Sequence, residues 1–295
     1  EPGDEHRLER EAGRLRERVK DLEQQLKENS ALADILDGVR AQGIKPPRWV
    51  ARQKVGKNRA IATAALADGH FDEVVSAHEI EFLNAYNREI AELRLRKFGQ
   101  STIEIGRDFF KGVAIEGLVL PILGDMVSGD IHDELEQTNE ADIIDTALYW
   151  SDRLCALVLQ LLEHYGRVFV PCVVGNHGRT DRKPRAKRRV SRNFDFLIYA
   201  LMMRHFRDKG IPESEVQFQI ATGPDTDYPI YNTRYRITHG DQFRGGSGIA
   251  GALSPMLLGD ARKRKKCNIA GRAYDHLIIG HWHREIDLGS VSGGN

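Results

Sequence analysis

Five short polar segments constrain the fold of this chain most strongly, because each directly follows an apolar run. The apolar runs have the length of buried strands and cover residues 61–67, 118–123, 168–174, 235–238 and 277–279. The polar segments that follow them are Asp68-Gly69-His70, Gly124-Asp125, Gly175-Asn176-His177, His239-Gly240-Asp241 and Gly280-His281-Trp282-His283. In layered α/β proteins, ligands collect beyond the carboxyl ends of the strands. We therefore expect these segments to meet at one functional site.

Stretches with helical periodicity lie between the apolar runs, at residues 79–98, 140–164 and 194–209. In the second of them, Leu154, Leu157 and Leu161 mark an apolar face. Strands that alternate with helices in this way predict a layered α/β domain over residues 61–295.

The first 40 residues follow a different pattern. From Leu8 onward, apolar residues recur at alternating spacings of four and three with charged residues between them, which is a heptad seam. Val19 at an a position and Leu22 at a d position are compatible with a parallel two-stranded coiled coil, in which Asn29 fixes the register. A single amphipathic helix packed on its own domain explains the pattern equally well. We expect a coiled-coil helix at 1–40 that mediates homo-oligomer formation, and a linker at 41–60.

The composition is that of an ordinary globular protein. Hydrophobic residues make up 41% of the 295 residues and charged residues 29%, and the formal net charge is zero. The sequence contains no run of about 18 apolar residues, so it predicts no membrane span. The charged first residues do not resemble a signal peptide. The cysteines, Cys155, Cys172 and Cys267, lack the paired spacing of zinc sites or disulfide frameworks. We therefore expect a cytoplasmic protein with no membrane partner.

The polar segments contain the residue types that a pair of divalent metal ions needs. Hydrolysis of a phosphate ester requires a nucleophile stronger than water and a counter-charge for the oxyanion, and two ions about 3.5–4 Å apart supply both. Asp125 is the natural bridging carboxylate, because Gly124 lets the backbone turn tightly at a strand end. His281 and His283 alternate, so on a strand both would face the same side.

In their order, the five segments resemble the calcineurin-like metallophosphoesterase superfamily, whose pattern is D-x-H, G-D, G-N-H, H and G-H-x-H. The resemblance covers roughly residues 62–285 and implies a four-layered α/β fold, a β-sandwich flanked by helices. It implies that one metal ion is held by Asp68, His70, Asp125 and His283, and the other by Asp125, Asn176, His239 and His281. It also implies that His177 contacts the scissile phosphate and helps the leaving oxygen accept a proton.

Segments 124–135 and 239–246 are similar to a branch of this superfamily that is common in bacteriophage genomes and resembles DNA-repair exonucleases. The chain departs from the wider superfamily at Gly178, where an acidic residue often orients the preceding histidine. We therefore expect another group to hold His177, or His177 to contribute less. Among the histidines outside the segments, His132 is the strongest candidate for a further role.

Taken singly, the segments have plainer interpretations. Asp68-Gly69-His70 and Gly175-Asn176-His177 are each ordinary turn sequences. Only the ordered set favours a metal site. The glycine-rich stretch at 245–251 lacks the context of a P-loop, and we expect it to form a flexible loop over the crevice.

Two basic clusters bear on the substrate. The first consists of Arg179, Arg182, Lys183, Arg185, Lys187, Arg188, Arg189 and Arg192, and the second of Arg262, Lys263, Arg264, Lys265 and Lys266. Both clusters lie between segments of the expected metal site, so we expect part of each near its rim, where cations attract a nucleic-acid backbone. Solvated loops are the alternative.

These features together predict a two-metal-dependent phosphodiester hydrolase that cleaves DNA, by in-line attack of a hydroxide shared between the ions. Mn²⁺ is the expected ion, with Fe²⁺ and Zn²⁺ as alternatives. If the chain is phage-encoded, its location is the host cytoplasm. A phosphatase or a small-molecule phosphodiesterase, acting on a protein, a nucleotide or a cyclic nucleotide, would use the same centre. A non-enzymatic assembly protein that works through its coiled coil is the third hypothesis.

Overall fold

The computed structural model describes residues 45–52, 56, 58–243 and 253–283. The chain divides into two units, Glu1–Gly43 and Ile44–Asn295, and all described residues belong to the second. The coiled-coil helix expected at 1–40 and the glycine-rich stretch at 245–251 lie outside the described residues.

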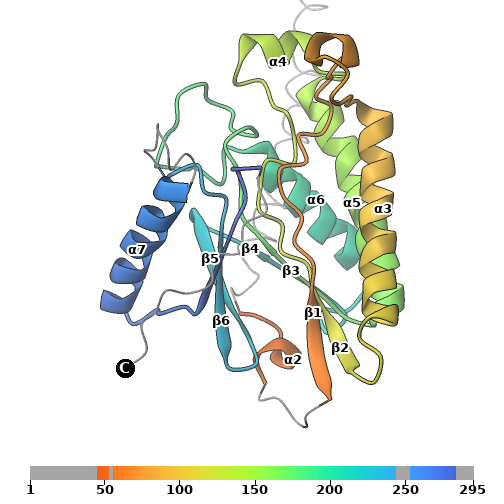
Figure 1. Ribbon diagram of the computed structural model, residues 1–295, viewed down its shortest axis with the longest axis vertical. Helices are drawn as coiled ribbons and strands as arrows, with labels where there is room; N and C mark the ends of the chain where they lie inside the picture. The colour runs from red at the N-terminus through yellow and green to blue at the C-terminus, as the bar shows by residue number, and fades with distance from the viewer. Residues whose placement is uncertain (1–44, 53–55, 57, 244–252, 284–295) are drawn as a thin grey trace, which may run out of the picture. The chain divides into compact units, whose positions relative to one another are not determined.

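A parallel sheet forms the centre of the second unit (Figure 1). Its strands are ordered β1-β2-β3-β4 and comprise β1 (Arg59–Thr63), β2 (Ala114–Val119), β3 (Val168–Cys172) and β4 (Val216–Ile220). Every residue of β3 is buried, as in a strand covered on both faces. Beyond the ends of β1 and β2, Ile122 pairs with Leu66 and with Cys172, the last residue of β3. The segments that follow β1, β2 and β3 therefore leave the sheet side by side.

Three long helices cover one face of this sheet (Figure 1), and they are α3 (Arg88–Asp108), α5 (Ile143–Tyr165) and α6 (Phe194–Asp208). Leu154, Leu157 and Leu161 of α5 are buried, which confirms the apolar face expected from the sequence. None of the described helices is both long enough and apolar enough to cross a membrane.

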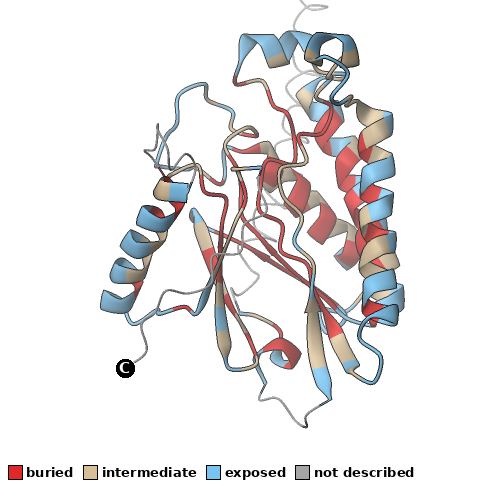
Figure 2. Cartoon of the chain, in the orientation of Figure 1, coloured by how far each residue is buried: buried red, intermediate tan, exposed pale blue. Residues whose placement is uncertain are grey.

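A second sheet packs against the other face of the first. It contains β5 (Asp225–Ile230), β6 (Thr233–Thr238) and β7 (His276–Ile279), with β5 antiparallel and β7 parallel to β6. One buried cluster combines Val119 and Phe169 of the first sheet with Tyr228 and Ile237 of the second, and buried residues fill this region in Figure 2. The helix α7 (Leu253–Ile269) lies beside the second sheet (Figure 1). The unit is therefore a mixed α/β domain with two sheets around a shared core.

Part of the segment expected as a linker belongs to this core. The short helix α2 (Arg48–Ala51) lies within residues 41–60, and its Trp49 and Val50 are buried between the sheets. Gly117 of β2 leaves room for this contact, because a Cβ there would lie 2.7 Å from the Trp49 ring. Residues 48–51 thus pack against the sheets and do not form a free connection.

The helix boundaries follow the sequence expectations where apolar periodicity is strong. The stretches 140–164 and 194–209 correspond to α5 and α6 within a few residues. The helix expected at 79–98 starts later in the structure, where α3 begins after Asn87. The Asn87 side chain caps this helix by accepting the Ile90 N–H at 2.9 Å. The preceding residues form a 3-10 helix, η1 (Ala77–Ile80), and a turn in which Glu81 is left-handed. Besides α2 and η1, the helices α4 (Asp133–Thr138) and α7 were not anticipated.

Candidate metal centre

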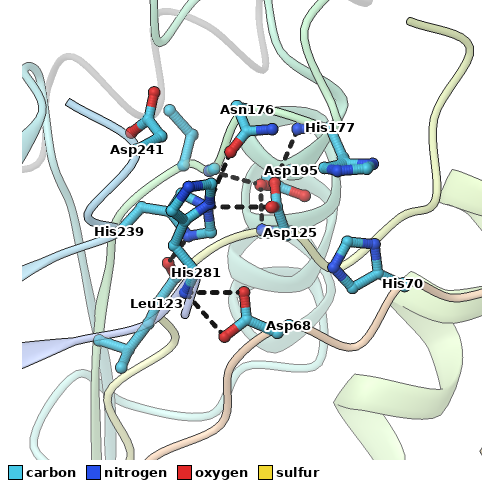
Figure 3. A network of polar contacts seen from close by, with 12 residues as sticks. Asp68, His70, Leu123, Asp125, Asn176, His177, Asp195, His239, Asp241 and His281 are labelled. Carbon is cyan, nitrogen blue, oxygen red and sulfur yellow. Dashed lines mark hydrogen bonds and ion pairs between the residues drawn. The ribbon is translucent and has the colours of Figure 1, made fainter. Parts of the chain in front are cut away.

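The polar segments that follow β1, β2, β3, β6 and β7 converge at one edge of the two sheets (Figure 3). Their ligand atoms form three groups within each of which all atoms lie within 4.8 Å of one another. The groups are Asp68, His70 and His283; His70, Asp125 and His177; and Asp125, His239 and His281. The centre thus brings together all the predicted carboxylate and imidazole ligands, and Asp125 and His70 each belong to two groups.

The first half of the centre comprises Asp68, His70 and His283. In it, ring nitrogens of the two histidines point at each other. The Nε2 atoms of His70 and His283 are 3.2 Å apart, and Nε2 of His283 is 3.7 Å from Oδ1 of Asp68. Burial, together with the nearby charge of His177, lowers the pKa of His70 to about 4. His70 is therefore neutral at physiological pH, which is the form of imidazole that ligates metal ions.

The second half of the centre comprises Asp125, His239 and His281. In it, the His239 ring is held in one orientation. Its Nδ1 lies 2.8 Å from the Leu123 carbonyl oxygen, so the Nδ1–H donates there and Nε2 faces the other ligands. Nε2 lies 2.9 Å from Oδ2 of Asp125 and 3.1 Å from Oδ1 of Asn176. The backbone N–H of His281 donates to both carboxylate oxygens of Asp68 at 2.9 Å. The predicted ligand Asn176 is therefore part of the same cluster.

His239 and Asp125 also shift each other's protonation. Burial alone would lower the pKa of His239, but its hydrogen bond to Asp125 and the charge of that carboxylate outweigh burial and raise the pKa to about 9. Burial would raise the pKa of Asp125, but the hydrogen bond and charge of His239 hold it well below its usual range. When no ion is bound, a proton therefore lies on His239, where the candidate ligands of the second half converge.

His177 is oriented by a backbone carbonyl. Its Nδ1 lies 2.8 Å from the Ser128 carbonyl oxygen, and its backbone N–H donates to Oδ1 of Asp125 at 2.7 Å. A side chain at the next position would displace Asn193, because a Cβ at Gly178 would lie 2.5 Å from its Oδ1. A group other than an acidic neighbour thus holds His177. The His132 ring lies 6.1 Å from the His177 ring, centroid to centroid.

The backbone of the centre is tightly packed and strained. A Cβ at Gly124, whose φ is +90°, would lie 2.2 Å from the Gly175 nitrogen, and a Cβ at Gly175 would lie 2.0 Å from Oδ1 of Asp125. Five predicted ligands have φ between 42° and 71°, namely Asp68, His70, Asp125, His281 and His283. Such left-handed residues cost about 1–3 kcal/mol each and cluster at functional sites.

Asp195 is a residue of the centre that the sequence did not reveal. Its fully buried carboxylate accepts the backbone N–H groups of Asp125, Met126 and Gly175 at 2.9, 3.0 and 2.8 Å (Figure 3). Asn193 accepts the Asp195 N–H at 2.8 Å and donates to the Gly175 carbonyl at 2.9 Å. In the sequence, these two residues carry only the signal of a helix start. The start of α6 thus holds together two loops that carry predicted ligands.

The loop that carries Asp68 and His70 is anchored to the helices. Asp72 is buried, and its carboxylate accepts from Arg88 Nε at 2.8 Å, Trp150 Nε1 at 3.0 Å and Thr146 Oγ1 at 2.6 Å. The Trp150 ring also stacks on Phe71, with centroids 3.9 Å apart. Contacts from both α3 and α5 therefore fix this loop.

The two basic clusters lie in different places. Seven of the eight residues of the first cluster line a pocket that also includes Gly175 and Asn176, and Arg182 lies outside it, where it pairs with Asp133 and Glu136. The second cluster lies along α7 and contributes no residue to that pocket. Within it, Lys263 pairs with Asp225 at 2.6 Å and Arg264 with Asp260 at 2.8 Å, whereas Arg262, Lys265 and Lys266 are exposed.

Comparisons of the chain with protein families, with curated proteins and with solved structures find no match. The case for function therefore rests on the geometry of the centre. Each half of the centre offers at least one carboxylate and two imidazoles, and Asp125 lies between the halves. Such donors suit Mn²⁺, Fe²⁺ or Zn²⁺, and the hydrogen bond that fixes the His239 ring is typical of a metal-ligating histidine. The residues present thus fit a pair of divalent ions.

Proposed function

We propose that this chain is a two-metal-dependent phosphodiester hydrolase that cleaves DNA. The observation that carries the proposal is the position of Asp125, whose carboxylate groups with His70 and His177 on one side and with His239 and His281 on the other. A carboxylate shared in this way is what a two-ion centre requires. The remaining ligands would be Asp68, His70 and His283 for one ion, and Asn176, His239 and His281 for the other.

The arrangement of layers supports the four-layered metallophosphoesterase fold that the sequence resembles. Two sheets share one core, three helices cover the outer face of the first sheet, and α7 lies beside the second. In this fold the strand ends of both sheets deliver ligands to the same edge.

The roles of the chain's own groups follow from their contacts. When bound, the two ions supply an activated water and positive charge for the phosphoryl oxygens. His177 is held by the Ser128 carbonyl at Nδ1, so Nε2 is the ring atom that would donate a proton to the leaving oxygen, from the imidazolium form. Asp195 keeps the backbone of Asp125 and Gly175 in place, which maintains the relative positions of the ligands.

The first basic cluster supports a nucleic acid as the substrate. Its pocket shares Asn176 with the centre, so a polyanionic strand bound there lies beside the predicted ligands. The protein as a whole carries no net charge, and attraction of DNA must come from this local concentration of cations.

Cleavage of labelled single- and double-stranded DNA with Mn²⁺ tests the proposal, alongside bis(p-nitrophenyl) phosphate as a generic phosphodiester. We expect cleavage that a chelator abolishes and that Asp125→Asn lowers by at least about 100-fold, because one change removes a ligand from both halves. Asp152→Asn is the matched control, since Asp152 is exposed on α5, and it should cleave like the wild type.

The other outcomes distinguish the rival functions. Cleavage of the generic ester alone would indicate a small or protein-borne phosphoester. No cleavage of either substrate would favour a non-enzymatic assembly protein. Full activity of Asp125→Asn would contradict the proposed centre.

A further inference from the structure

A basic pocket lies beside the candidate metal centre, in the segment between His177 and α6. Gly175 and Asn176 line it on the side of the centre, and the rest of its wall includes seven basic and two acidic side chains. The pocket therefore shares the predicted ligand Asn176 with the centre and carries a strong excess of positive charge.

Some of the basic residues serve to build the wall. Arg179 donates to the backbone carbonyls of Asn176, Asp181 and Arg182 at 3.1, 2.9 and 2.9 Å. Arg192 pairs with the Asp181 carboxylate at 3.1 Å. These bonds fold the segment against the loop that carries Asn176.

A partly buried ion pair connects the pocket to the second half of the centre. Arg189 donates to both carboxylate oxygens of Asp241, each at 2.7 Å, and its side chain is 20% exposed while that of Asp241 is 14% exposed. Asp241 follows the predicted ligand His239 by two residues. The bidentate geometry holds the pocket in a fixed position relative to the ligands.

The remaining cations face solvent. Lys183, Lys187 and Arg188 are exposed and make no ion pair with any described residue. Arg185 is 64% exposed and lies 3.5 Å from Asp181. Since Asp181 is shared by Arg185 and Arg192, and Asp241 pairs with Arg189, the acidic residues of the wall do not neutralise Lys183, Lys187 and Arg188.

Arg188 adds a second observation. Its φ is +58°, in the left-handed region that arginine adopts only at a cost in energy. A glycine would fit this backbone without strain. Arg188 therefore presents a charged side chain at a cost in local stability.

We propose that this pocket binds the phosphate next to the scissile one on a DNA strand, with Lys187 and Arg188 as its main contacts. The inference rests on the proposed function and extends it, because it requires a substrate with at least two linked phosphates. A nucleic-acid strand carries a phosphate on every nucleotide, so a strand held at the centre brings a neighbouring phosphate to an adjoining basic pocket.

The direct test measures the binding of a labelled single-stranded oligonucleotide in the presence of chelator. Fluorescence anisotropy reports the affinity at several salt concentrations. We expect K187A/R188G to bind at least about tenfold more weakly than the wild type. The slope of log affinity against log salt should fall by about 0.7 for each phosphate contact that is lost. K97A/K111A removes two exposed positive charges outside the pocket and should bind like the wild type.

Two controls keep this test decisive. Glycine at position 188 suits the local backbone, and the thermal midpoint of K187A/R188G should stay within a few degrees of the wild type. The variants leave Arg189 intact, because its pair with Asp241 is part of the wall. No binding by the wild type, equal binding by K187A/R188G, or equal weakening in K97A/K111A would overturn the pocket's role.

A kinetic comparison separates the pocket from the chemistry. With Mn²⁺, the wild type should hydrolyse a trinucleotide with two phosphodiesters at a higher kcat/KM than a dinucleotide with one. K187A/R188G should lose most of that preference and hydrolyse the dinucleotide as the wild type does. If the wild type hydrolyses neither, the proposed function fails, and the binding experiment with chelator still decides whether the pocket takes a DNA strand. An unchanged trinucleotide preference in K187A/R188G would contradict the inference.

Discussion

At the scale of single residues, His239 and Asp125 form a proton-binding pair when no ion is bound. Their 2.9 Å contact raises the pKa of His239 to about 9 against its burial. The ordinary pKa of histidine is about 6.5. The folded chain therefore keeps a proton on His239 over a pH range in which the unfolded chain loses it.

This pair predicts how stability depends on pH in the presence of chelator. A group whose folded pKa is raised stabilises the fold fully below its unfolded pKa, and the stabilisation is lost as the pH rises through the folded pKa. We expect the free energy of unfolding to fall by about 1–3 kcal/mol between pH 6.5 and 9. Urea denaturation measures it, and His239→Asn should remove this part of the dependence. A flat profile from pH 6.5 to 9 in the wild type would contradict the assignment.

At the scale of elements, the start of α6 acts as a clamp on two loops. The Asp195 carboxylate accepts three backbone N–H groups from the loops after β2 and β3. Burial, and then the charge of Asp125, raise its pKa to about 6. The carboxylate is not itself a ligand in any of the ligand groups, so we expect it to act by positioning Asp125 and Asn176.

The clamp predicts a specific phenotype for Asp195→Asn. An amide offers one acceptor oxygen in place of two and turns an N–H₂ group toward backbone donors, so at least one N–H loses its partner. We expect Mn²⁺ affinity to fall about 10–100-fold, by analogy with groups that orient metal ligands. Calorimetric titration measures it, together with the thermal midpoint in chelator to account for lost stability.

Asp208→Asn, at the exposed end of the same helix, is the matched control and should bind Mn²⁺ as the wild type does. Unchanged Mn²⁺ affinity in Asp195→Asn would show that the contact is structural alone.

The same scale explains what the sequence could predict. The strand ends and α5 were predictable because apolar runs and the periodicity of Leu154, Leu157 and Leu161 are local signals. The residue types at the strand ends indicated the candidate ligands for the same reason, and the structure brings these residues together. The role of Asp195 was not predictable, because its partner Asp125 is 70 residues away and is reached only through tertiary packing. The helix α3 starts later than the composition predicts. Asn87 caps its N-terminus, and the residues before Asn87 are not part of the helix although their composition is helical.

Basic residues with the same sequence pattern have different surroundings in the fold. The first and second clusters look alike as runs of Arg and Lys, yet only the first lines a pocket beside Asn176. Within it, Arg189 and Lys187 are close in sequence but differ in role, since Arg189 is bound to Asp241 while Lys187 is exposed. Partners of charged side chains depend on the fold, and no local pattern specifies them.

At the scale of the whole molecule, the centre joins the two sheets. Asp68, His70, Asp125 and Asn176 follow strands of the first sheet, whereas His239, His281 and His283 follow strands of the second. The buried cluster between the sheets, which includes Phe169 and Ile237, sets the distance between these two groups of ligands. We therefore expect metal binding to be coupled to the packing of the sheets, because ions that bind only the folded chain stabilise it.

The stoichiometry and sharing of the ions test the central claim most directly. Calorimetric titration of the full chain with Mn²⁺ should show two ions per chain for the wild type. Asp125→Asn should weaken both binding events, since Asp125 contributes to both halves, whereas His283→Ala should weaken one and leave the other, since His283 belongs to the first half alone. Fewer than two ions in the wild type, or an Asp125→Asn variant in which one binding event is untouched, would contradict a centre bridged by Asp125.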